Sequence, residues 1–421
     1  MLNVDPERAV ADLRELAEFG RLGHGVNRRA LTAEDVAARE WLRQRMLAAG
    51  LEAEIDGVGN VIGRTPGCRR HIIIGSHTDS VPKGGWLDGA MGVIFGLEVA
   101  RAWVEAGARG DTGIEVISFN DEEGRFAGLL GSSVFCGSRD AAEATKIRAD
   151  DGTTLGEALA KAGYGGRSIA RLDPHRHIAY LEAHIEQGPV LEQAGKKIGV
   201  VTEIVGVQRA RLTFTGQADH AGTTPMALRR DAAAAMYDFA VKFAATCREQ
   251  GSPHTVWNLG SASLDPGAYN VVTRQAELGI EYRDATASVL DRIHAAIPAL
   301  AARCATDHNV EWSVAEGTKT SPAVMNPELM DRIEQAAVAQ GASTLRMPSG
   351  AGHDAMLFAE RIPTGMLFVP SIGGRSHDTS EDTDRTDIAL GLRVFAAAIV
   401  DVLKGAGINP SHGSPTGTTP L

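Results

Sequence analysis

Four continuous apolar runs, each ending in or followed by histidine and carboxylate residues, constrain the fold of this chain most strongly. They are residues 72–74, residues 114–119, the run that contains Glu182, and residues 366–370. An unbroken apolar run is typical of a strand that is buried on both faces of a sheet. Because such strands alternate with helical segments through about residue 200, the sequence predicts an α/β sheet. Ligands bind such sheets beyond the carboxyl ends of the strands.

The pattern changes near Val205. Residues 207–216 and 276–283 alternate apolar and polar side chains, as a strand with one exposed face does. Helical spacing at 231–249 and 287–306 accompanies them, which predicts a compact α+β module. The expected fold is therefore a large mixed α/β sheet with helices on both faces and an inserted smaller α+β domain.

The domain boundaries follow from these changes of pattern. Residues 1–206 and 323–404 are expected to form the two parts of a metal-binding catalytic domain, with residues 207–322 inserted between them. The last segment, 405–421, is rich in Gly, Pro, Ser and Thr and is expected to be disordered.

Charge and composition exclude several classes of function. The net charge of -11 and the pI of about 5.7 argue against nucleic acid or an anionic membrane as a partner. The sequence contains no apolar run of transmembrane length and no secretory signal pattern, so a cytoplasmic location is expected. The 4 cysteines are far apart and form no CxxC pair, which indicates neither a thiolate zinc site nor a disulfide framework.

The polar groups at the strand ends form a set of possible metal ligands without sulfur. The set is His77, Asp88, Glu123, His184 and His377. Imidazole and carboxylate ligands suit zinc, manganese, cobalt or nickel. Five ligands exceed the number that one catalytic metal usually takes, so two metals that share Asp88 are the simplest arrangement. Any one of these residues alone is more readily a solvated acid or a structural histidine, but five at strand ends favour a site.

Two further carboxylates accompany this set. Asp79 follows His77 by two residues and is placed to accept the second N–H of its ring. Adjacent side chains on a loop point apart, so Glu122 and Glu123 can divide the work. One of them would bind metal, and the other would face the substrate as a general base.

Seven motifs resemble those of a known family. They are GSHTDS (75–80), LDG (87–89), NDEEGRF (120–126), HIEQGPVLE (184–192), HAGTTPM (220–226), SGAGHDA (349–355) and SHD (376–378). They are similar to the hydantoinase/carbamoylase branch of the M20 metallopeptidase-like amidohydrolases. That branch holds N-carbamoyl-L-amino acid hydrolases, β-ureidopropionases and allantoate amidohydrolases. The match runs in order from about residue 10 to residue 403.

The resemblance implies two divalent metal ions per subunit. His77 and His184 would hold one ion, Glu123 and His377 the other, and Asp88 would bridge them.

The resemblance also implies catalytic roles outside the ligand set. Glu122 would be the catalytic acid and base, and Asp79 would orient His77. The inserted module would be a lid and dimerisation domain. Its His220 would stabilise the oxyanion on closure, from the same chain or from the partner subunit.

Substrate binding is implied for four residues besides His220: Gln187, Asn270, Arg283 and His353. Arg283 is suited to bind a substrate carboxylate through two hydrogen bonds. Two positions depart from the family pattern, because Thr273 stands where proline is expected and Asp378 where asparagine is common. Neither departure removes a group that the chemistry requires.

The predicted activity is that of a dinuclear-metal amidohydrolase. It would hydrolyse the linear C–N bond of an N-carbamoyl (ureido) amino acid, a small substrate with a carboxylate, and release the amino acid, ammonia and carbon dioxide. The predicted assembly is a homodimer formed through residues 207–322. Alternatives are allantoate or another ureide, an N-acyl amino acid or a dipeptide at the same site, and, more distantly, a non-catalytic binding protein of the same fold.

Overall fold

The computed structural model describes residues 2–108 and 110–405. It divides into two compact units, the larger formed by the described residues of Met1–Thr202 and Val324–Leu421 and the smaller by Glu203–Ala323. Beyond Gly405, the predicted disordered tail lies outside the described residues.

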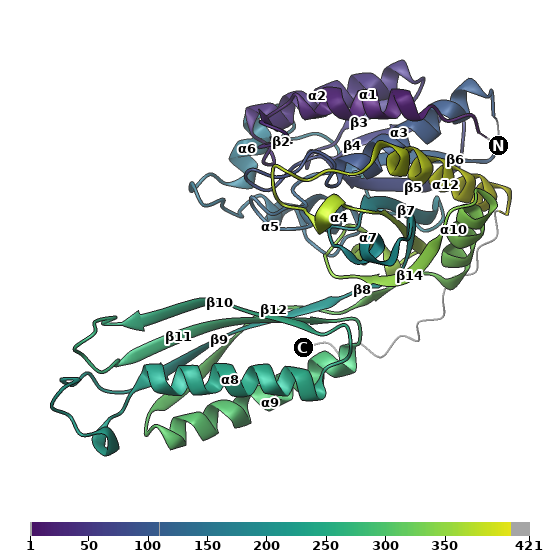
Figure 1. Ribbon diagram of the computed structural model, residues 1–421. Helices are drawn as coiled ribbons and strands as arrows, with labels where there is room; N and C mark the ends of the chain where they lie inside the picture. The colour runs from purple at the N-terminus through teal and green to yellow at the C-terminus, as the bar shows by residue number, and fades with distance from the viewer. Residues whose placement is uncertain (1, 109, 406–421) are drawn as a thin grey trace. The chain divides into compact units, whose positions relative to one another are not determined.

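The larger unit is built on a mixed sheet of nine strands in the order β13-β8-β15-β7-β5-β6-β4-β3, with β14 beside β8. The strands are β3 (Glu52–Ile55), β4 (Val61–Arg64), β5 (Arg70–His77), β6 (Thr112–Phe119), β7 (His177–Ile185), β8 (Ile198–Ile204), β13 (Ala323–Val324), β14 (Thr344–Ser349) and β15 (Thr364–Val369). The neighbours β15, β7, β5 and β6 are parallel, whereas β4 and β8 pair antiparallel to this group (Figure 1). The carboxyl ends of the four parallel strands therefore meet at one edge of the sheet.

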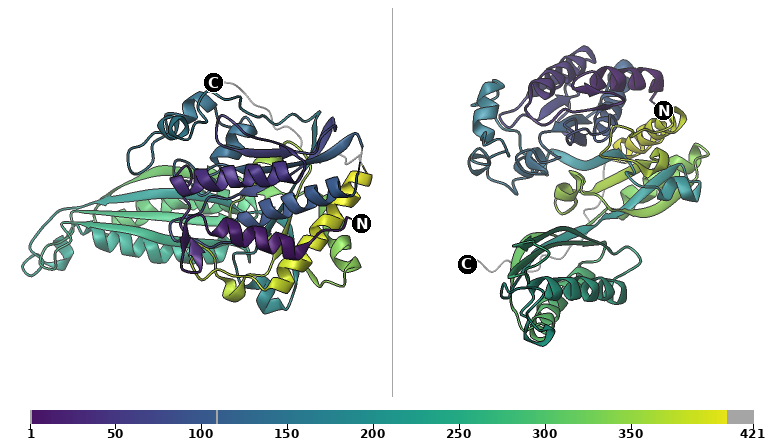
Figure 2. Two further views of the ribbon diagram at one scale, coloured as in Figure 1. Left: turned by 90° about the horizontal axis from the view of Figure 1, so that it is seen from above. Right: turned by 60° about the vertical axis from the view of Figure 1, so that its left-hand side comes forward.

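Helices cover both faces of this sheet (Figures 1 and 2). They are α1 (Pro6–Ala17), α2 (Ala33–Ala48), α3 (Ala90–Glu105), α4 (Leu130–Phe135), α5 (Ala141–Ala144), α6 (Leu155–Lys161), α7 (Val190–Ala194), α10 (Pro327–Ala339), α11 (Ala355–Ala359) and α12 (Arg385–Lys404). In β5, Ile74 packs against α3, while the next residue, Gly75, faces Tyr180 on the opposite side. There, Phe358 of α11 stacks on Tyr180 with ring centroids 4.0 Å apart. The prediction of a mixed sheet with helices on both faces is confirmed.

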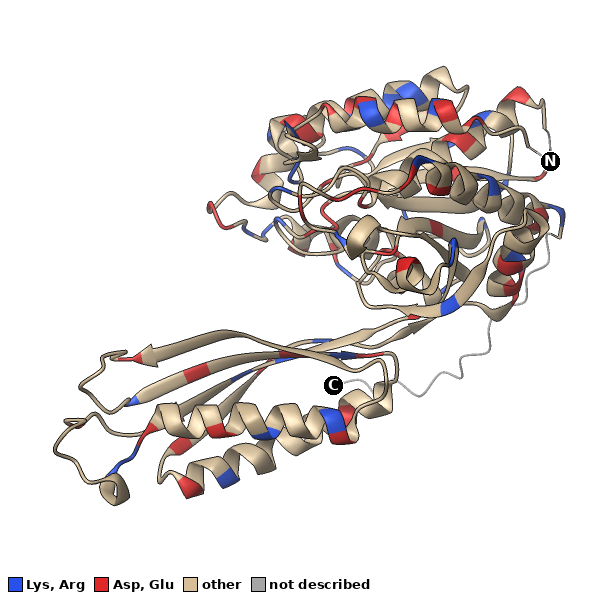
Figure 3. Cartoon of the chain, in the orientation of Figure 1, with Lys and Arg blue, Asp and Glu red and all other residues tan. Residues whose placement is uncertain are grey.

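Helix α2 differs in one detail from its sequence pattern. Thr32 caps the helix by accepting a hydrogen bond from the N–H of Asp35, as a capping box requires. The carboxylate of Asp35 does not return the bond to Thr32. It accepts instead from the N–H of Leu31 at 2.7 Å and from Nε of Arg39 at 2.6 Å. Charged residues of both signs alternate along α1 and α2 (Figure 3), but Asp35 and Arg39 are fully buried.

The smaller unit is a four-stranded antiparallel sheet in the order β10-β11-β9-β12. Its elements are β9 (Gly206–Thr215), β10 (Val256–Asp265), β11 (Gln275–Asp284), β12 (Glu311–Thr320), α8 (Ala232–Gln250) and α9 (Ala287–Asp307). Alternate residues of β9, such as Leu212 and Phe214, pack on Phe239 and Phe243 of α8. The two helices lie on one face of the sheet and leave the other open. The expected α+β architecture is confirmed, although the sequence pattern did not predict β10.

None of the helices in the described parts of the chain combines the length and the hydrophobicity needed to span a membrane.

Candidate metal centre

The four parallel strands bring the predicted metal ligands to one edge of the sheet. His77 is the last residue of β5, and His184 is the second-last residue of β7. Glu122 and Glu123 follow β6, and His377 lies in the loop after β15. Since these strands are parallel neighbours, residues more than 250 positions apart in the chain lie together.

Asp88 occupies the centre of the cluster, in the turn before α3. Its Oδ1 lies 3.2 Å from Nε2 of His184 and 3.8 Å from Nε2 of His77, while its Oδ2 lies 3.3 Å from Nε2 of His377. Nε2 of His377 is also 3.6 Å from Oε2 of Glu123. The structure thus brings the five predicted ligands into two groups that share Asp88, with the ligand atoms of each group within 4.8 Å of one another.

The histidine tautomers fit metal binding. Nδ1 of His77 lies 3.0 Å from the carbonyl oxygen of Asp79, and Nδ1 of His184 lies 2.9 Å from the carbonyl oxygen of Ile185. When these Nδ1–H groups donate to the main chain, each Nε2 keeps a lone pair on the side of Asp88, which is the usual support of a ligating histidine. The lone pair of His184 Nε2 accepts from the N–H of Gly89 at 3.1 Å. Two ligands at about 2.1 Å from one tetrahedral ion stand about 3.4 Å apart, close to the separations around Asp88.

The charge balance of the cluster also fits a divalent cation. Asp88, Glu122 and Glu123 make ion pairs only with imidazoles among the described residues, and with no lysine or arginine. Burial, together with the charge of Asp88, raises the pKa of Glu123 to about 8, and burial with the charge of Glu123 raises the pKa of Glu122 well above its usual value. Burial lowers the pKa of His184, but the Asp88 carboxylate stabilises the protonated form of the ring and raises its pKa to about 9 overall. Such a cluster of carboxylates calls for additional positive charge.

Gly89 allows this close packing. Its φ is +63°, and a Cβ there would lie 2.4 Å from the ring atoms of His77. Only glycine meets both conditions at the start of α3. In contrast to His77 and His184, which are buried, the side chain of His377 is 53% exposed, so the cluster opens to solvent on that side.

Asp79 has a different role from the predicted one. Its carboxylate oxygen lies 4.0 Å from Nδ1 of His77, too far for the expected hydrogen bond, and its main-chain carbonyl takes that place. The carboxylate instead accepts from the N–H groups of Glu122 at 3.4 Å and Glu123 at 3.2 Å. Asp79 therefore orients His77 through its backbone and holds the Glu122–Glu123 turn through its side chain.

Two buried arginines lie behind Asp79. Nη2 of Arg39 is 3.9 Å from the Asp79 carboxylate, and Arg28 donates to the carbonyl oxygen of Thr78 at 2.7 Å. Burial raises the pKa of Asp79 to about 6, and the charge of Arg39 opposes this shift. Arg39 also bonds Asp35 of the same helix, so α2 supplies the counter-charge for the turn that bears Glu122.

Gln187 and His353 both lie against the ligand cluster. Nε2 of Gln187 donates to Oδ2 of Asp88 at 3.0 Å and to Oγ of Ser376 at 3.2 Å. His353 is buried, with its ring centroid 4.5 Å from that of His184 and Nε2 2.9 Å from Oγ of Ser349.

The other three predicted site residues lie in the smaller unit. His220 and Asn270 are neighbours, because the N–H of Ala221 donates to the carbonyl oxygen of Asn270 at 3.0 Å and His220 forms a bridge to Val271. Arg283 lies at the opposite end of β11 from the Asn270 loop and pairs with Glu281 at 2.7 Å. The structure therefore brings His220 and Asn270 together and separates both from Arg283.

Several functional side chains were not found from the sequence. Glu381 accepts hydrogen bonds from the loop of Asp88 and from Ser376 beside His377. Glu182 is buried behind His184 and accepts from Ser76 and Tyr180. Glu182 stands in the segment singled out before His184, but nothing in the local sequence separates a buried acid from a solvated one.

Two histidines outside the ligand cluster are also buried. His71 and His177 are each only 2% exposed. Nε2 of His177 lies 3.4 Å from the buried carboxylate of Glu115. Their strands are buried on both faces, so polar residues within them are buried as well.

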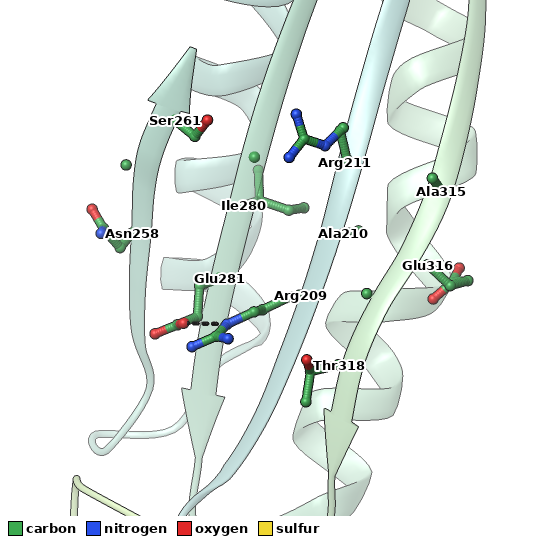
Figure 4. Close-up of a pocket in the computed structure, with 13 residues that line it drawn as sticks. Arg209, Ala210, Arg211, Asn258, Ser261, Ile280, Glu281, Ala315, Glu316 and Thr318 are labelled. Carbon is green, nitrogen blue, oxygen red and sulfur yellow. Dashed lines mark hydrogen bonds and ion pairs between the residues drawn. The ribbon is translucent and has the colours of Figure 1, made fainter. Parts of the chain in front are cut away.

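A groove of about 530 Å³ lies on the open face of the sheet in the smaller unit (Figure 4). The groove is lined by Arg209 and Arg211, with small residues between them. Arg209 pairs with Glu281 at 2.6 Å. Because the two charges of this pair satisfy each other, the groove offers no concentrated charge of one sign. It contains none of the metal-ligand groups.

Comparisons with known proteins agree with this geometry. A family model described as Peptidase family M20/M25/M40 matches residues 73–401. A crystal structure of an amidase of the hydantoinase/carbamoylase family from Burkholderia phymatum has a TM-score of 0.89 and 43% identity, covering 96% of this chain and 99% of that chain.

Two curated relatives cover most of their lengths. An N-carbamoyl-L-amino acid amidohydrolase of Geobacillus stearothermophilus is 36% identical over 96% of this chain and 100% of its own. An allantoate amidohydrolase of Escherichia coli (strain K12) is 34% identical over 88% of this chain and 92% of its own. This chain therefore belongs to the M20/M25/M40 peptidase family, as a hydrolase of its hydantoinase/carbamoylase branch that acts on non-peptide C–N bonds.

Proposed function

We propose that this chain hydrolyses the linear C–N bond of an N-carbamoyl amino acid and releases the amino acid, ammonia and carbon dioxide. The position of Asp88 carries the proposal, with one oxygen towards His77 and His184, the other towards His377, and Glu122 alongside. The Geobacillus relative, named an N-carbamoyl-L-amino acid amidohydrolase, supports this substrate class.

Two divalent ions per subunit complete the site in this proposal. His77 and His184 would hold one, Glu123 and His377 the other, and Asp88 would contact both. When bound, the ions act as Lewis acids on the ureido carbonyl and on a water. Zinc, manganese, cobalt and nickel all accept this set of nitrogen and oxygen donors.

Glu122 is the general base and acid. Its Oε2 lies 3.7 Å from Nε2 of His77, and its side chain is 12% exposed, so it reaches both the ligand cluster and the substrate. Glu123 points towards His377, which leaves Glu122 for proton transfer. Glu122 takes a proton from the attacking water and returns it to the leaving nitrogen. The hydrogen bonds from the turn to Asp79 fix the backbone for this transfer.

Further predicted residues bind the substrate in this proposal. Arg283 clamps the substrate carboxylate through two parallel hydrogen bonds, a geometry that guanidinium groups favour. Gln187 offers its amide beside the carboxylate of Asp88, and His353 fixes the wall of the pocket behind His184.

His220 stabilises the oxyanion, with Asn270 beside it, and both act on the partner's site. From Gln275 to Arg283, β11 extends about 27 Å at about 3.4 Å per residue. This length exceeds that of an N-carbamoyl amino acid, so the two ends of one sheet do not reach the same substrate molecule. In the homodimer, Arg283 binds the substrate of one site, and His220 of the partner subunit completes that site.

The dimer contact of this proposal is an edge of the smaller unit. Tyr237 and Val241, one turn apart on α8, are 56% and 71% exposed, and Val256 at the start of β10 is 55% exposed. β10 is an edge strand whose outer backbone groups have no strand partner within the described sheet. Edge strands with adjacent apolar side chains are natural sites of association.

Metal-dependent ammonia release tests the function. Chelator-treated protein is reloaded with zinc, manganese, cobalt or nickel and assayed on N-carbamoyl-L-amino acids, N-carbamoyl-β-alanine, allantoate and an N-acetyl amino acid. Ammonia from a carbamoyl substrate only after reloading supports the proposal. Glu122→Gln is expected to lower turnover by about 10²- to 10⁴-fold while metal remains bound, and an active variant would refute its assigned role.

The same panel separates the alternatives. Ammonia from allantoate alone would favour the activity for which the Escherichia coli relative is named. Free amine without ammonia from the N-acetyl substrate would favour an acylase or dipeptidase. Metal binding without turnover of any substrate would favour a binding protein of the same fold.

A further inference from the structure

The buried carboxylate of Glu381 joins the loop of Asp88 to the loop of His377, and these two residues belong to the ligand group of Asp88, Glu123 and His377. Its Oε1 accepts from the N–H of Leu87 at 3.1 Å and from the N–H of Asp88 at 3.0 Å. Its Oε2 accepts from Oγ of Ser376, next to His377, at 2.8 Å. The side chain is 1% exposed, and all three donors are groups of the site loops.

Ser376 closes this network onto the shared ligand. Its Oγ lies 3.4 Å from Oδ2 of Asp88, the same oxygen that faces His377 at 3.3 Å. Nε2 of Gln187 contacts both Ser376 and that oxygen. Consequently, a shift of Glu381 moves the backbone of Asp88 and the side chain of Ser376 together.

Gly85 makes room for this arrangement. A Cβ on Gly85 would lie 1.9 Å from both Cδ and Oε1 of Glu381, and the three nearest atoms to it all belong to this side chain. The φ of Gly85 lies outside the left-handed region, so an alanine there meets no backbone strain. The atoms that it would strike first are those of the Glu381 carboxylate, which it would push away from the N–H groups of Leu87 and Asp88.

We infer that Glu381 is a positioning residue, which holds the Asp88 loop against the His377 loop and sets the spacing of the ligands for the second metal. This inference rests on the proposed metal-dependent function. Glu381 is not among the ligand groups, so it acts through the hydrogen bonds of the two loops. Such supporting residues contribute about 10- to 100-fold to metal affinity.

Shape and charge are separable at this position. Glutamine has the shape of glutamate. Its Oε1 accepts from both N–H groups, and its Nε2 donates to Oγ of Ser376, which also accepts hydrogen bonds. Aspartate keeps the charge but is one methylene shorter and does not reach both loops. If Glu381 acts by positioning the loops, glutamine is expected to preserve zinc affinity and aspartate to reduce it. If its charge is what matters, aspartate is expected to preserve the affinity and glutamine to reduce it.

The experiment is a double-mutant cycle read by zinc affinity. The metal-free forms of the wild type, Glu381→Ala, Gly85→Ala and the double variant are titrated against a chelating dye, and their Tm values are measured in parallel. Each single variant is expected to weaken the affinity for one of the two zinc ions about 10- to 100-fold. In the Glu381→Ala background, Gly85→Ala is expected to add less than about 2-fold, because the atoms that it would strike are absent.

Matched variants complete the design. Glu381→Gln is expected to bind zinc within about 3-fold of the wild type and Glu381→Asp to match the alanine variant. Asp382→Asn is the control, because among the described residues the Asp382 side chain accepts a hydrogen bond only from the N–H of Thr383. If Glu381→Ala does not fold, Gly85→Ala and Glu381→Gln still test the inference.

Three results would overturn the inference. The first is an unchanged zinc affinity in Glu381→Ala or Gly85→Ala. The second is an equal loss of zinc affinity on Gly85→Ala in the wild-type and Glu381→Ala backgrounds. The third is that Glu381→Asp keeps the zinc affinity while Glu381→Gln loses it. A lower Tm of the metal-free variants without a change in zinc affinity would show that Glu381 only stabilises the fold. If the wild type binds two zinc ions but hydrolyses no ureide, the proposed function is refuted. The zinc affinities of the variants can then still be compared with that of the wild type. Wild type that binds no zinc refutes both.

Discussion

Defined heterodimers test whether His220 completes the site of the partner subunit. Glu122→Gln and His220→Ala are each expected to inactivate the proposed homodimer, by about 10²- to 10⁴-fold for the general base and about 10²- to 10³-fold for the oxyanion donor. Two affinity tags on co-expressed chains allow each heterodimer to be purified. On one chain, Arg283 lies about 27 Å along β11 from Gln275, which is at the end of the sheet where the His220 and Asn270 loops lie, so His220 and Arg283 are predicted to serve different sites.

The expected rates follow from counting complete sites. If His220 acts on the partner's site, a heterodimer of Glu122→Gln with His220→Ala contains one complete site of two and has about half the wild-type rate. A heterodimer of wild type with the Glu122→Gln/His220→Ala double variant contains none and is inactive. If His220 acts within its own chain, the first heterodimer is inactive and the second retains about half the rate.

The assay is ammonia release from the best carbamoyl substrate of the panel. Wild type paired with Glu122→Gln is the control, because about half the rate is expected under either arrangement. An inactive first heterodimer together with an active second one would refute the argument from the length of β11. A purely monomeric protein in light scattering would refute the dimer itself.

Three further predictions concern metal, buried charge and pH. Chelation is expected to abolish activity and to lower the Tm, because a ligand that binds only the folded state stabilises it. Adding zinc, manganese, cobalt or nickel is expected to restore the Tm, which calorimetry or fluorescence measures. Arg39→Met is expected to lower the free energy of unfolding by about 3 to 5 kcal/mol in urea titrations, since it removes the guanidinium that pairs with the buried Asp35 and Asp79. Arg43→Met, on the exposed side of the same helix, is expected to cost at most about 1 kcal/mol, and equal losses would contradict this account. Burial raises the pKa of Glu115, but the ring of His177 at 3.4 Å and the charge of Arg64 lower it overall to about 2, below its ordinary value of about 4.5. This carboxylate therefore contributes on the order of 3 kcal/mol above about pH 4.5, and the contribution disappears as the pH falls towards about 2. Urea titrations of wild type and Glu115→Gln across this range are expected to converge at low pH, and a constant difference would show that ionisation of Glu115 is not the cause.

The large sheet was predictable because its strands are local and chemically uniform. Residues 114–119 and 366–370 are continuous apolar runs, and they form β6 and β15. The helices predicted from 3.6-residue spacing at 231–249 and 287–306 correspond to α8 and α9, with errors of at most one residue at the ends. β10 was missed because residues 258–263 carry Asn, Gly, Ser and Ala instead of the β-branched and aromatic residues that mark a strand.

The ligand set was visible in the sequence because polar groups at the ends of buried strands stand out against the apolar runs. The roles of their neighbours were less visible. Asp79 stands two residues from His77, as a partner of its ring would, but the chain turns so that the carbonyl oxygen reaches the ring and the carboxylate reaches Glu122 and Glu123. A local interval in sequence does not determine which oxygen of a residue faces a neighbour.

By itself, the sequence determined the α/β class, the inserted α+β module and the five ligand candidates, because these depend on periodicity and on residue type at strand ends. Only the tertiary structure decided which groups share Asp88, that Arg39 lies behind Asp79, and that Glu381 joins two loops nearly three hundred residues apart. It also separated Arg283 from His220 within one sheet. Hydrogen bonds and ion pairs between distant segments depend on distances of a few ångströms. Such distances are set when the strands align in the sheet and leave no periodic trace along the chain.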